Sequence, residues 1–118
     1  MDLRRMRTPL VALIVLMLAF GANAFGGVQS EDAVLLTLSV IDVGQGDSVL
    51  ISTSDGHAML VDGGPADASS KVINAISKAG CDKLDVLVST HPHADHIGGL
   101  ARVLDGVRVD RVIDSGKV

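Results

Sequence analysis

Three of the four histidines in this 118-residue chain lie within one stretch of six residues. The stretch reads HPHADH, from residue 91 to residue 96, and an aspartate precedes its last histidine. Packing a hydrophobic core does not call for such a concentration of imidazole, because histidine is only an intermediate core residue. The stretch is therefore either a metal site or a surface loop that is rich in histidine.

The loop is stiff, because Pro92 fixes its own φ and restricts the residue before it to extended backbone. If the strand direction persists, His91, His93 and Asp95 project to the same side, and His96 approaches from another angle. Imidazole suits zinc, iron or manganese, and a carboxylate widens the choice. Four such donors could serve one ion, or two ions about 3.5–4 Å apart. We expect a metal site; the alternative is solvated histidines, or one histidine that caps the next helix.

The elements before the loop are expected to be three strands in succession. Apolar and β-branched residues predict these strands at residues 34–43, 48–53 and 57–62. A glycine turn separates the first two, and the Asp55-Gly56 pair favours a hairpin before the third. The third strand stops at a cluster of two glycines and a proline at residues 63–65.

A helix is predicted next, and its apolar face is formed by Val72, Ala75, Ile76 and Ala79. Either Asp67 or Ser69 can cap its start, Lys78 suits its last turn, and Gly80 stands where a C-terminal cap belongs.

Residues 83–90 read as a strand that leads into the histidine loop, with Leu84, Val86 and Val88 alternating in part. A short second helix follows, marked by Ile97, Leu100, Ala101 and Leu104 and closed by Gly106, and residues 107–114 read as a further strand. This order predicts an α/β fold with a mixed sheet and helices on at least one face. The histidine loop then leaves the C-terminal end of a strand, where open α/β sheets collect their ligands.

The first 24 residues are interpreted as a signal peptide. They contain a basic start, an apolar run from residue 10 to residue 20 and the small-residue pattern ANA at residues 22–24. Eleven apolar residues are short for a membrane span, although an uncleaved anchor is the alternative. We therefore expect residues 25–118 to form one small domain-like segment that is secreted or periplasmic, with no stable membrane partner after cleavage.

Composition limits the remaining function classes. Removing residues 1–24 would take away three of ten basic residues but only one of fourteen acidic ones, so the rest is acidic. Because the rest is acidic, it offers no basic stripe for non-specific nucleic-acid binding. Tyrosine and tryptophan are absent from the chain, so it also lacks their rings as stacking platforms for bases. The lone Cys81 has no partner for an internal disulfide.

The stretch THPHADHIGG resembles the H-x-H-x-D-H signature of the metallo-β-lactamase superfamily. Together with DVGQGDSVLI at residues 42–51 and VDGG at residues 61–64, it is similar to one branch of that superfamily. This branch is the metallo-β-lactamase-like domain at the C-terminal end of the ComEC DNA-uptake proteins, with its free-standing relatives. The resemblance implies an αββα sandwich, of which this chain would hold only the first half.

The resemblance also implies roles for individual residues. His91 and His93 would bind a first divalent ion and Asp95 and His96 a second, with zinc or manganese as the metal. Asp62 would orient the ligands without binding the metal itself; the alternative is that it is an ordinary turn residue. A glycine turn near the site could contribute substrate contacts, although a turn alone explains its glycines; the residues concerned are Gln45, Asp47 and Ser48.

The chemistry that the resemblance implies is metal-assisted hydrolysis, with Asp95 as the catalytic residue that orients the nucleophile. Bound divalent ions lower the pKa of water toward about 7 and polarise the group under attack. A phosphodiester, in nucleic acid or in a small molecule, is the substrate expected first. The alternatives are another ester or amide, or a catalytically incomplete metal-binding remnant, and the oligomeric state stays open.

Two departures from the family pattern affect these expectations. The family completes its site with later ligands, a histidine, a bridging aspartate and a final histidine, yet no histidine follows His96 here. We therefore expect this chain to be a piece of a longer protein, with one face of its sheet exposed. A signal peptide directly before the domain also differs from ComEC proteins, in which a large membrane part precedes it.

Overall fold

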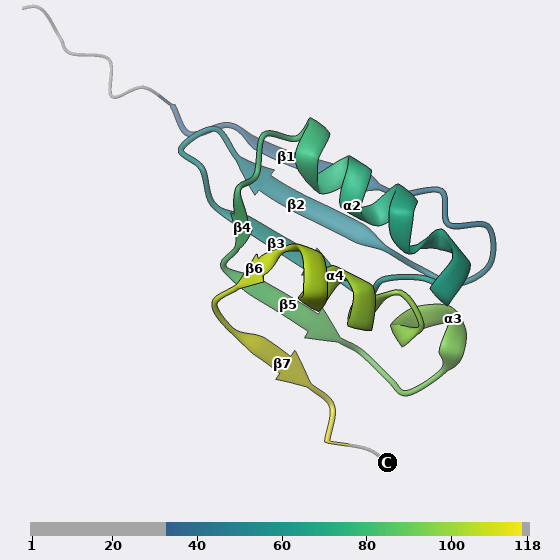
Figure 1. Cartoon of the computed structure of the whole chain (residues 1–118). Coiled ribbons are helices and arrows are strands. Elements are labelled where there is room, and N and C mark those ends of the chain that lie inside the picture. The colour runs from purple at the N-terminus through teal and green to yellow at the C-terminus, as the bar shows by residue number, and fades with distance from the viewer. Residues whose placement is uncertain (1–32, 117–118) are drawn as a thin grey trace, which may run out of the picture. The chain divides into compact units, whose positions relative to one another are not determined.

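The computed structural model describes residues 33–116, so the predicted signal peptide lies outside the described residues. Among the described residues, no helix has the length and apolar character needed to cross a bilayer. The elements follow one another along the chain (Figure 1) as β1 (Leu36–Val40), β2 (Val49–Thr53), β3 (Ala58–Val61), the 3-10 helix η1 (Ala66–Ala68), α2 (Ser69–Lys78), β4 (Lys83–Leu84), β5 (Val86–Ser89), α3 (Ala94–Ile97), α4 (Leu100–Gly106), β6 (Arg108–Val109) and β7 (Val112–Asp114).

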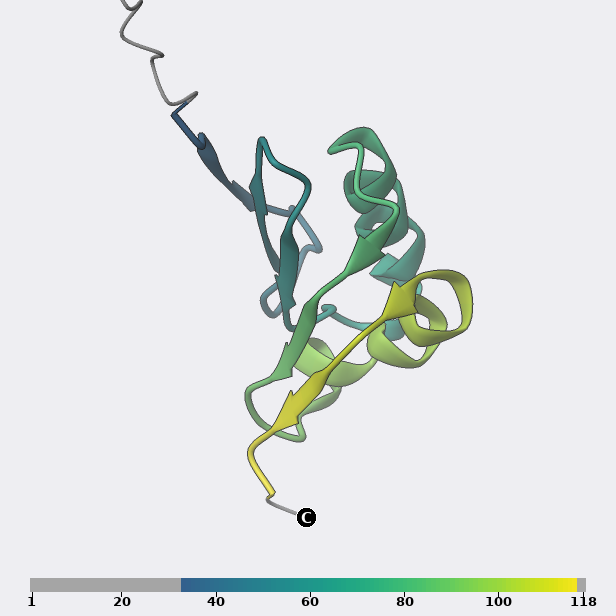
Figure 2. The same cartoon turned by 90° about the vertical axis from the view of Figure 1, so that its left-hand side faces the viewer.

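The predicted mixed sheet is present. Its strand order is β1-β2-β3-β5-β7, in which β1, β2 and β3 pair antiparallel and β5 pairs parallel with both β3 and β7. A second small sheet is formed by β4 and β6, which are parallel. The helices α2 and α4 lie on the same side of the five-stranded sheet (Figures 1 and 2). Antiparallel hairpins followed by parallel crossovers therefore give the predicted α/β architecture.

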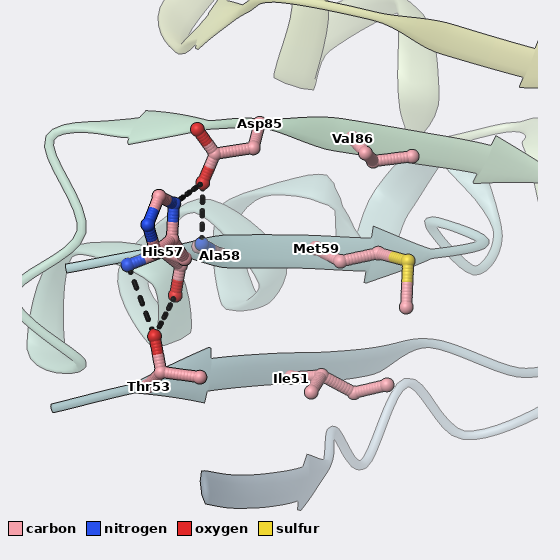
Figure 3. Close-up of a pocket in the computed structure, with 7 residues that line it drawn as sticks. All are labelled: Ile51, Thr53, His57, Ala58, Met59, Asp85 and Val86. Carbon is pink, nitrogen blue, oxygen red and sulfur yellow. Dashed lines mark hydrogen bonds and ion pairs between the residues drawn. The ribbon is translucent and has the colours of Figure 1, made fainter. Parts of the chain in front are cut away.

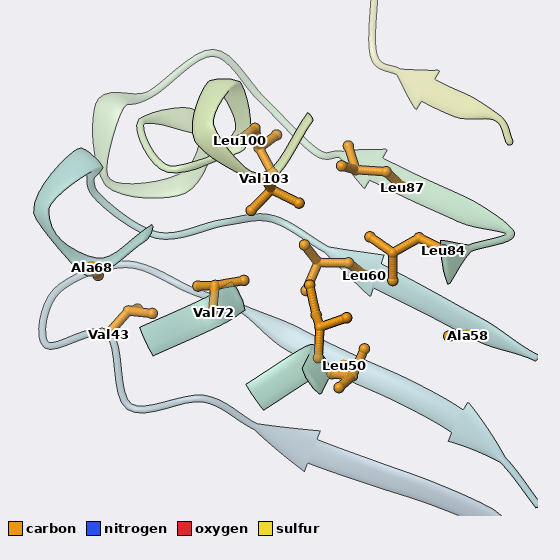
Figure 4. Packing of buried hydrophobic residues seen from close by; sticks show 11 residues of the cluster. Val43, Leu50, Ala58, Leu60, Ala68, Val72, Leu84, Leu87, Leu100 and Val103 are labelled. Atoms are coloured by element: carbon orange, nitrogen blue, oxygen red, sulfur yellow. The ribbon is translucent and has the colours of Figure 1, made fainter. Parts of the chain in front are cut away.

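The hydrophobic core lies between the sheet and these helices (Figure 4). Leu50, Leu60 and Leu87 are at most 1% exposed, and they meet Val72 of α2 and Val103 of α4. Side chains alternate across a strand, so each of the central strands directs one set of residues into this core. The packing holds the carboxyl ends of β3 and β5 side by side.

The opposite face of the sheet carries exposed apolar side chains. In β1, Leu36, Leu38 and Val40 are 66%, 60% and 75% exposed. Thr37 and Ser39 between them line a cavity beside α2, which places them on the helix-covered side. Within residues 33–116 no helix covers the apolar face (Figure 2), in agreement with the expected exposure.

Two predicted strands are each divided in the structure. The strand expected at residues 83–90 breaks at Asp85, and the one expected at residues 107–114 breaks between Val109 and Val112. Lys83 contacts the carboxylates of both Asp85 and Asp110. The two breaks occur together because the chain leaves the small sheet and enters the large one at both places.

The second predicted helix is also divided, and its apolar face is only half as predicted: Leu100 is buried and Ile97 packs against the core, whereas Ala101 is exposed. The helical backbone already begins at Ala94, and Gly98-Gly99 separates α3 from α4. Val103 is buried, while Leu104 is 48% exposed.

The predicted ends of the first helix are only half correct. The start of α2 has no side-chain capping hydrogen bond, because Asp67 lies in η1 and Ser69 is a buried residue of the first turn. At the other end, Gly80 has a φ of 72° and its N–H donates to the Ser77 carbonyl. Gly80 therefore terminates the helix as predicted.

Candidate metal centre

The histidine stretch lies where two parallel neighbours, β3 and β5, end together. Leu60 and Val61 of β3 pair with Leu87 and Val88 of β5, so the residues after each strand emerge at one edge. Asp62 directly follows β3, and the histidine stretch begins two residues after β5. The site therefore lies at the C-terminal edge of the sheet, as predicted.

Asp62 is held in an unusual backbone conformation. Its φ is 57°, the left-handed region that aspartate and asparagine enter more readily than most residues. Its N–H donates to the Val88 carbonyl at 2.9 Å, and its own carbonyl accepts from Ser48 Oγ at 3.1 Å. The side chain is 3% exposed, and this backbone directs it toward the loop after β5.

The Asp62 carboxylate accepts three hydrogen bonds. The donors are the Thr90 N–H at 2.9 Å, Thr90 Oγ1 at 2.6 Å and His96 Nδ1 at 3.0 Å. Burial by itself would raise the pKa of Asp62, but the hydrogen bonds from Thr90 and His96 outweigh it and lower the pKa. Asp62 is therefore an ionised acceptor at neutral pH.

These hydrogen bonds determine which nitrogen of each ring carries the proton. A hydroxyl has one proton, and Thr90 Oγ1 donates it to Asp62, so Oγ1 accepts from His91 Nδ1 at 2.9 Å. His96 likewise donates from Nδ1 to Asp62. Both histidines consequently keep Nε2 free as a metal donor, the usual arrangement of a histidine ligand.

The structure brings some of the predicted ligands close together. Donor atoms of Asp62, His91 and His96 all lie within 4.8 Å of one another. The His91 ring centroid is 4.0 Å from that of His96 and 4.7 Å from that of His93. His93 is exposed and precedes α3, but its side chain makes no capping hydrogen bond there. A helix-capping role therefore does not explain this histidine.

The expected direction of Asp95 is wrong. Its projection beside His91 and His93 assumed an extended strand, but β5 ends at Ser89 and Asp95 lies in the helical turn α3. There its Oδ2 is 3.8 Å from His96 Nε2. The helical turn thus places Asp95 beside the free nitrogen of His96.

His96 lies among several carboxylates. The hydrogen bond to Asp62 raises the pKa of His96, burial opposes this, and the charges of Asp95 and Asp47 add to the increase. The side chain is 14% exposed. This negative surrounding favours a cation next to the imidazole, whether a proton or a metal ion.

The glycine turn before β2 lies beside the site. Asp47 Oδ2 is 3.8 Å from His96 Nδ1, and its side chain is 73% exposed. Gln45 is exposed, whereas Ser48 is fully buried and supports the Asp62 backbone. Burial excludes a substrate contact by Ser48, contrary to the expectation, while contacts by Gln45 and Asp47 stay a prediction.

Thr90 is the residue of the site that sequence reasoning missed. It joins Asp62 to His91 through its hydroxyl and donates its N–H to Asp62 as well. The available signal was its place, directly before the first histidine and directly after β5.

A pocket lies at the other end of β3 (Figure 3), and the fourth histidine lines it. His57 Nδ1 is 3.2 Å from Asp85 Oδ2, which also accepts from the Ala58 N–H at 2.9 Å. The His57 side chain is 70% exposed. Its carboxylate partner is already used by backbone and lysine, so this pocket is not the candidate centre.

Comparison with known proteins supports the resemblance. The family model of the metallo-beta-lactamase superfamily matches residues 41–117. Competence protein ComA of Neisseria gonorrhoeae is 38% identical over 66 residues, which are 56% of this chain and 10% of that protein. A Cronobacter sakazakii metallo-beta-lactamase with a HARLDQ motif is 24% identical, with a TM-score of 0.52 over 61% of this chain and 29% of that one.

This chain thus spans about a tenth of the curated relative and less than a third of the solved structure. The structural likeness shows a partial metallo-beta-lactamase fold, and the match to the competence protein confirms the expected ComEC-like similarity. The family match covers β2 through β7, including the whole histidine stretch and Asp62. The chain belongs to the metallo-beta-lactamase superfamily.

Proposed function

We propose that this chain carries the first part of a metal-dependent hydrolase that cleaves phosphodiesters. The observation that carries the proposal is the hydrogen-bond network around Asp62. It leaves the Nε2 atoms of His91 and His96 free and holds the two rings with their centroids 4.0 Å apart, while Asp95 Oδ2 lies 3.8 Å from His96 Nε2. A loop of solvated histidines has no need of a buried carboxylate that orients two of its rings.

The ligands are assigned in two pairs. His91 and His93 hold one divalent ion, and Asp95 and His96 hold the other, with zinc or manganese as the metal. The 3.8 Å between Asp95 Oδ2 and His96 Nε2 supports the second pair, because zinc bonds to each donor type are about 2.0–2.2 Å long. Asp62 acts behind the ligands, since both of its oxygens already accept hydrogen bonds.

Residues of the chain would have distinct roles in hydrolysis. Divalent ions at such a site acidify water and polarise the group under attack. Asp95 orients the nucleophile, and Asp62 keeps the proton of His96 on Nδ1. Thr90 does the same for His91. Each ion needs three or more protein donors, so ligands from further polypeptide would complete the centre.

The substrate class rests on the sequence relative. Similarity to a competence protein favours phosphodiesters of nucleic acid or of a small molecule. The second candidate is an ester or amide, favoured by the fold of the beta-lactamase from Cronobacter sakazakii.

Export of the protein after cleavage behind residue 24 is also part of the proposal. The alternative is a membrane-anchored form in which residues 1–24 are retained. The mass of the isolated protein tests whether the cleavage takes place.

The experiment compares hydrolysis by the protein purified from its own host with two matched histidine variants. Bis(p-nitrophenyl) phosphate, single-stranded DNA and the β-lactam nitrocefin are offered with manganese or zinc. We expect phosphodiester cleavage that His91→Ala lowers at least about 100-fold, because it removes a ligand. His57→Ala, an exposed histidine elsewhere, leaves the rate unchanged.

Two results would count against this function. If nitrocefin is the only compound cleaved, the substrate class is an amide and not a phosphodiester. Equal rates for His91→Ala and the wild-type protein would show that the histidine stretch takes no part in the hydrolysis.

A further inference from the structure

Main-chain hydrogen bonds join the two glycine turns to the helical turn that carries Asp95 and His96. The Gly64 N–H donates to the Asp47 carbonyl at 3.0 Å, and the Gly63 N–H donates to the His96 carbonyl at 2.7 Å. The turn of residues 42–48 therefore contacts the turn of residues 62–65, which in turn contacts α3. These hydrogen bonds join main-chain atoms only, so the residue types in the sequence do not reveal them.

The helical turn α3 depends on such contacts for its position. It spans only Ala94–Ile97, and none of its residues is buried. Ile97 packs against the core but is only partly buried, and a single turn without a fully buried residue gains little from hydrophobic packing. The placement of Asp95 and His96 therefore depends on the backbone segments that touch α3 from outside.

Gly46 makes the closest of these approaches. A Cβ built on Gly46 would lie 1.7 Å from the Asp95 carbonyl oxygen, 2.6 Å from its carbonyl carbon and 3.0 Å from its Cβ. These distances are too short for any side chain, and the atoms met are backbone that cannot rotate away. The turn of residues 42–48 is thus seated directly against the residue that carries a proposed ligand.

Gly44 provides a matched comparison within the same turn. Its φ is 83° and that of Gly46 is 88°, so an L-residue is strained to a similar extent at both positions. A Cβ on Gly44, however, would meet nothing within 4 Å. The two glycines share the backbone conformation and differ in the contact with Asp95.

We propose that Gly46 is a positioning residue of the metal centre. Its missing side chain lets the turn of residues 42–48 rest on the Asp95 backbone, and this contact sets where Asp95 and His96 present their donor atoms. The inference rests on the proposed function in so far as these two residues are ligands. A side chain at Gly46 pushes α3 away from the end of β5 and separates the second ligand pair from the first.

The test measures metal binding by the full chain with Gly46→Ala and Gly44→Ala. Competition titrations with zinc, and the visible spectrum of the cobalt-loaded protein, report affinity and coordination. We expect Gly46→Ala to weaken binding about 10–100-fold, the range seen when support behind a ligand is lost, and to alter the cobalt spectrum. Gly44→Ala changes binding less than about 3-fold, while both variants lose thermal stability through the same backbone strain.

Equal weakening by both substitutions would overturn the proposal, because strain in the turn would then explain the loss. Unchanged binding in Gly46→Ala would overturn it as well. If Gly46→Ala does not fold, Gly44→Ala decides the question, because it carries the same backbone strain without the contact to Asp95. Gly44→Ala is then expected to fold and to bind metal like the wild-type protein; a Gly44→Ala variant that also fails to fold would contradict the proposal, because backbone strain alone would explain both losses.

A separate readout distinguishes this inference from the proposed function. If the wild-type protein takes up no metal, the hydrolase proposal fails, and the metal-free protein still tests the contact. Amide chemical shifts of Asp95 and His96 then change in Gly46→Ala and stay in place in Gly44→Ala. Shifts that are the same in both variants would overturn the positioning role.

Discussion

At the scale of single residues, Asp62 is the centre of the site, although it is not proposed as a ligand. Its buried carboxylate fixes the proton positions of two histidines, one directly and one through Thr90. The left-handed backbone of Asp62 lets the chain turn immediately after β3. One acidic side chain therefore links the end of β3 to the loop after β5.

The depressed pKa of Asp62 makes stability depend on pH. The ionised form is favoured in the folded state, so its contribution is present above the unfolded pKa of 3.8 and is lost as pH falls through the lower folded value. Asp62→Asn keeps a residue that tolerates positive φ but removes the charge. We expect it to cost about 1.5–3 kcal/mol of unfolding free energy at pH 7, with the difference from wild type shrinking below pH 3.8.

Urea unfolding of the metal-free protein at pH 7 and at pH 3 measures this difference. The control is Asp67→Asn in η1, an exposed position whose substitution should stay within about 0.5 kcal/mol. A pH-independent difference for Asp62→Asn would show that the carboxylate charge does not support the fold.

Sequence patterns revealed some of these residues and not others. The spacing of the histidines and the position of Asp62 before two glycines are visible in the chain itself. Thr90 was missed because a threonine at a strand end is ordinary until its partners are known. The direction of Asp95 was missed because the alternating pattern does not show that β5 ends at Ser89.

At the scale of the elements, the predicted succession of strands and helices is correct, and the errors lie at their breaks. Apolar residues alternate through Leu84, Val86 and Val88, so nothing in the local pattern marks the division at Asp85. Pairing with β6 on one side of the break and with β3 and β7 on the other decides it. Such tertiary pairing overrides local propensity and is invisible to periodicity.

The packing between β3 and the helices holds the site in place, and two leucines test it. Leu60 is 0% exposed and Leu104 is 48% exposed. We expect Leu60→Ala to cost about 2–5 kcal/mol through lost burial and a residual cavity, measured by urea unfolding. Leu104→Ala, the same change at the surface of α4, should cost less than about 1 kcal/mol. Equal costs would mean that the core does not lie between β3 and the helices.

At the scale of the whole molecule, the described residues form one layer of helices on one face of a mixed sheet, and the other face stays apolar and exposed. Leaving the side chains of Leu36, Leu38 and Val40 together in water is unfavourable, because contiguous exposed apolar patches are rare on soluble proteins. The resemblance to a two-halved fold anticipated this exposure, whereas composition and periodicity did not. The ligand stretch lies at the edge of this sheet, where further protein donors could approach it.

The most direct measurement is a native mass spectrum of the protein isolated from its host, recorded for wild type, His91→Ala and His57→Ala. We expect wild-type protein that begins at Phe25 and retains divalent metal, loss of that metal in His91→Ala, and full retention in His57→Ala. Wild-type protein that holds no ion after incubation with zinc or manganese, or equal retention in both variants, would contradict a metal centre at the histidine stretch.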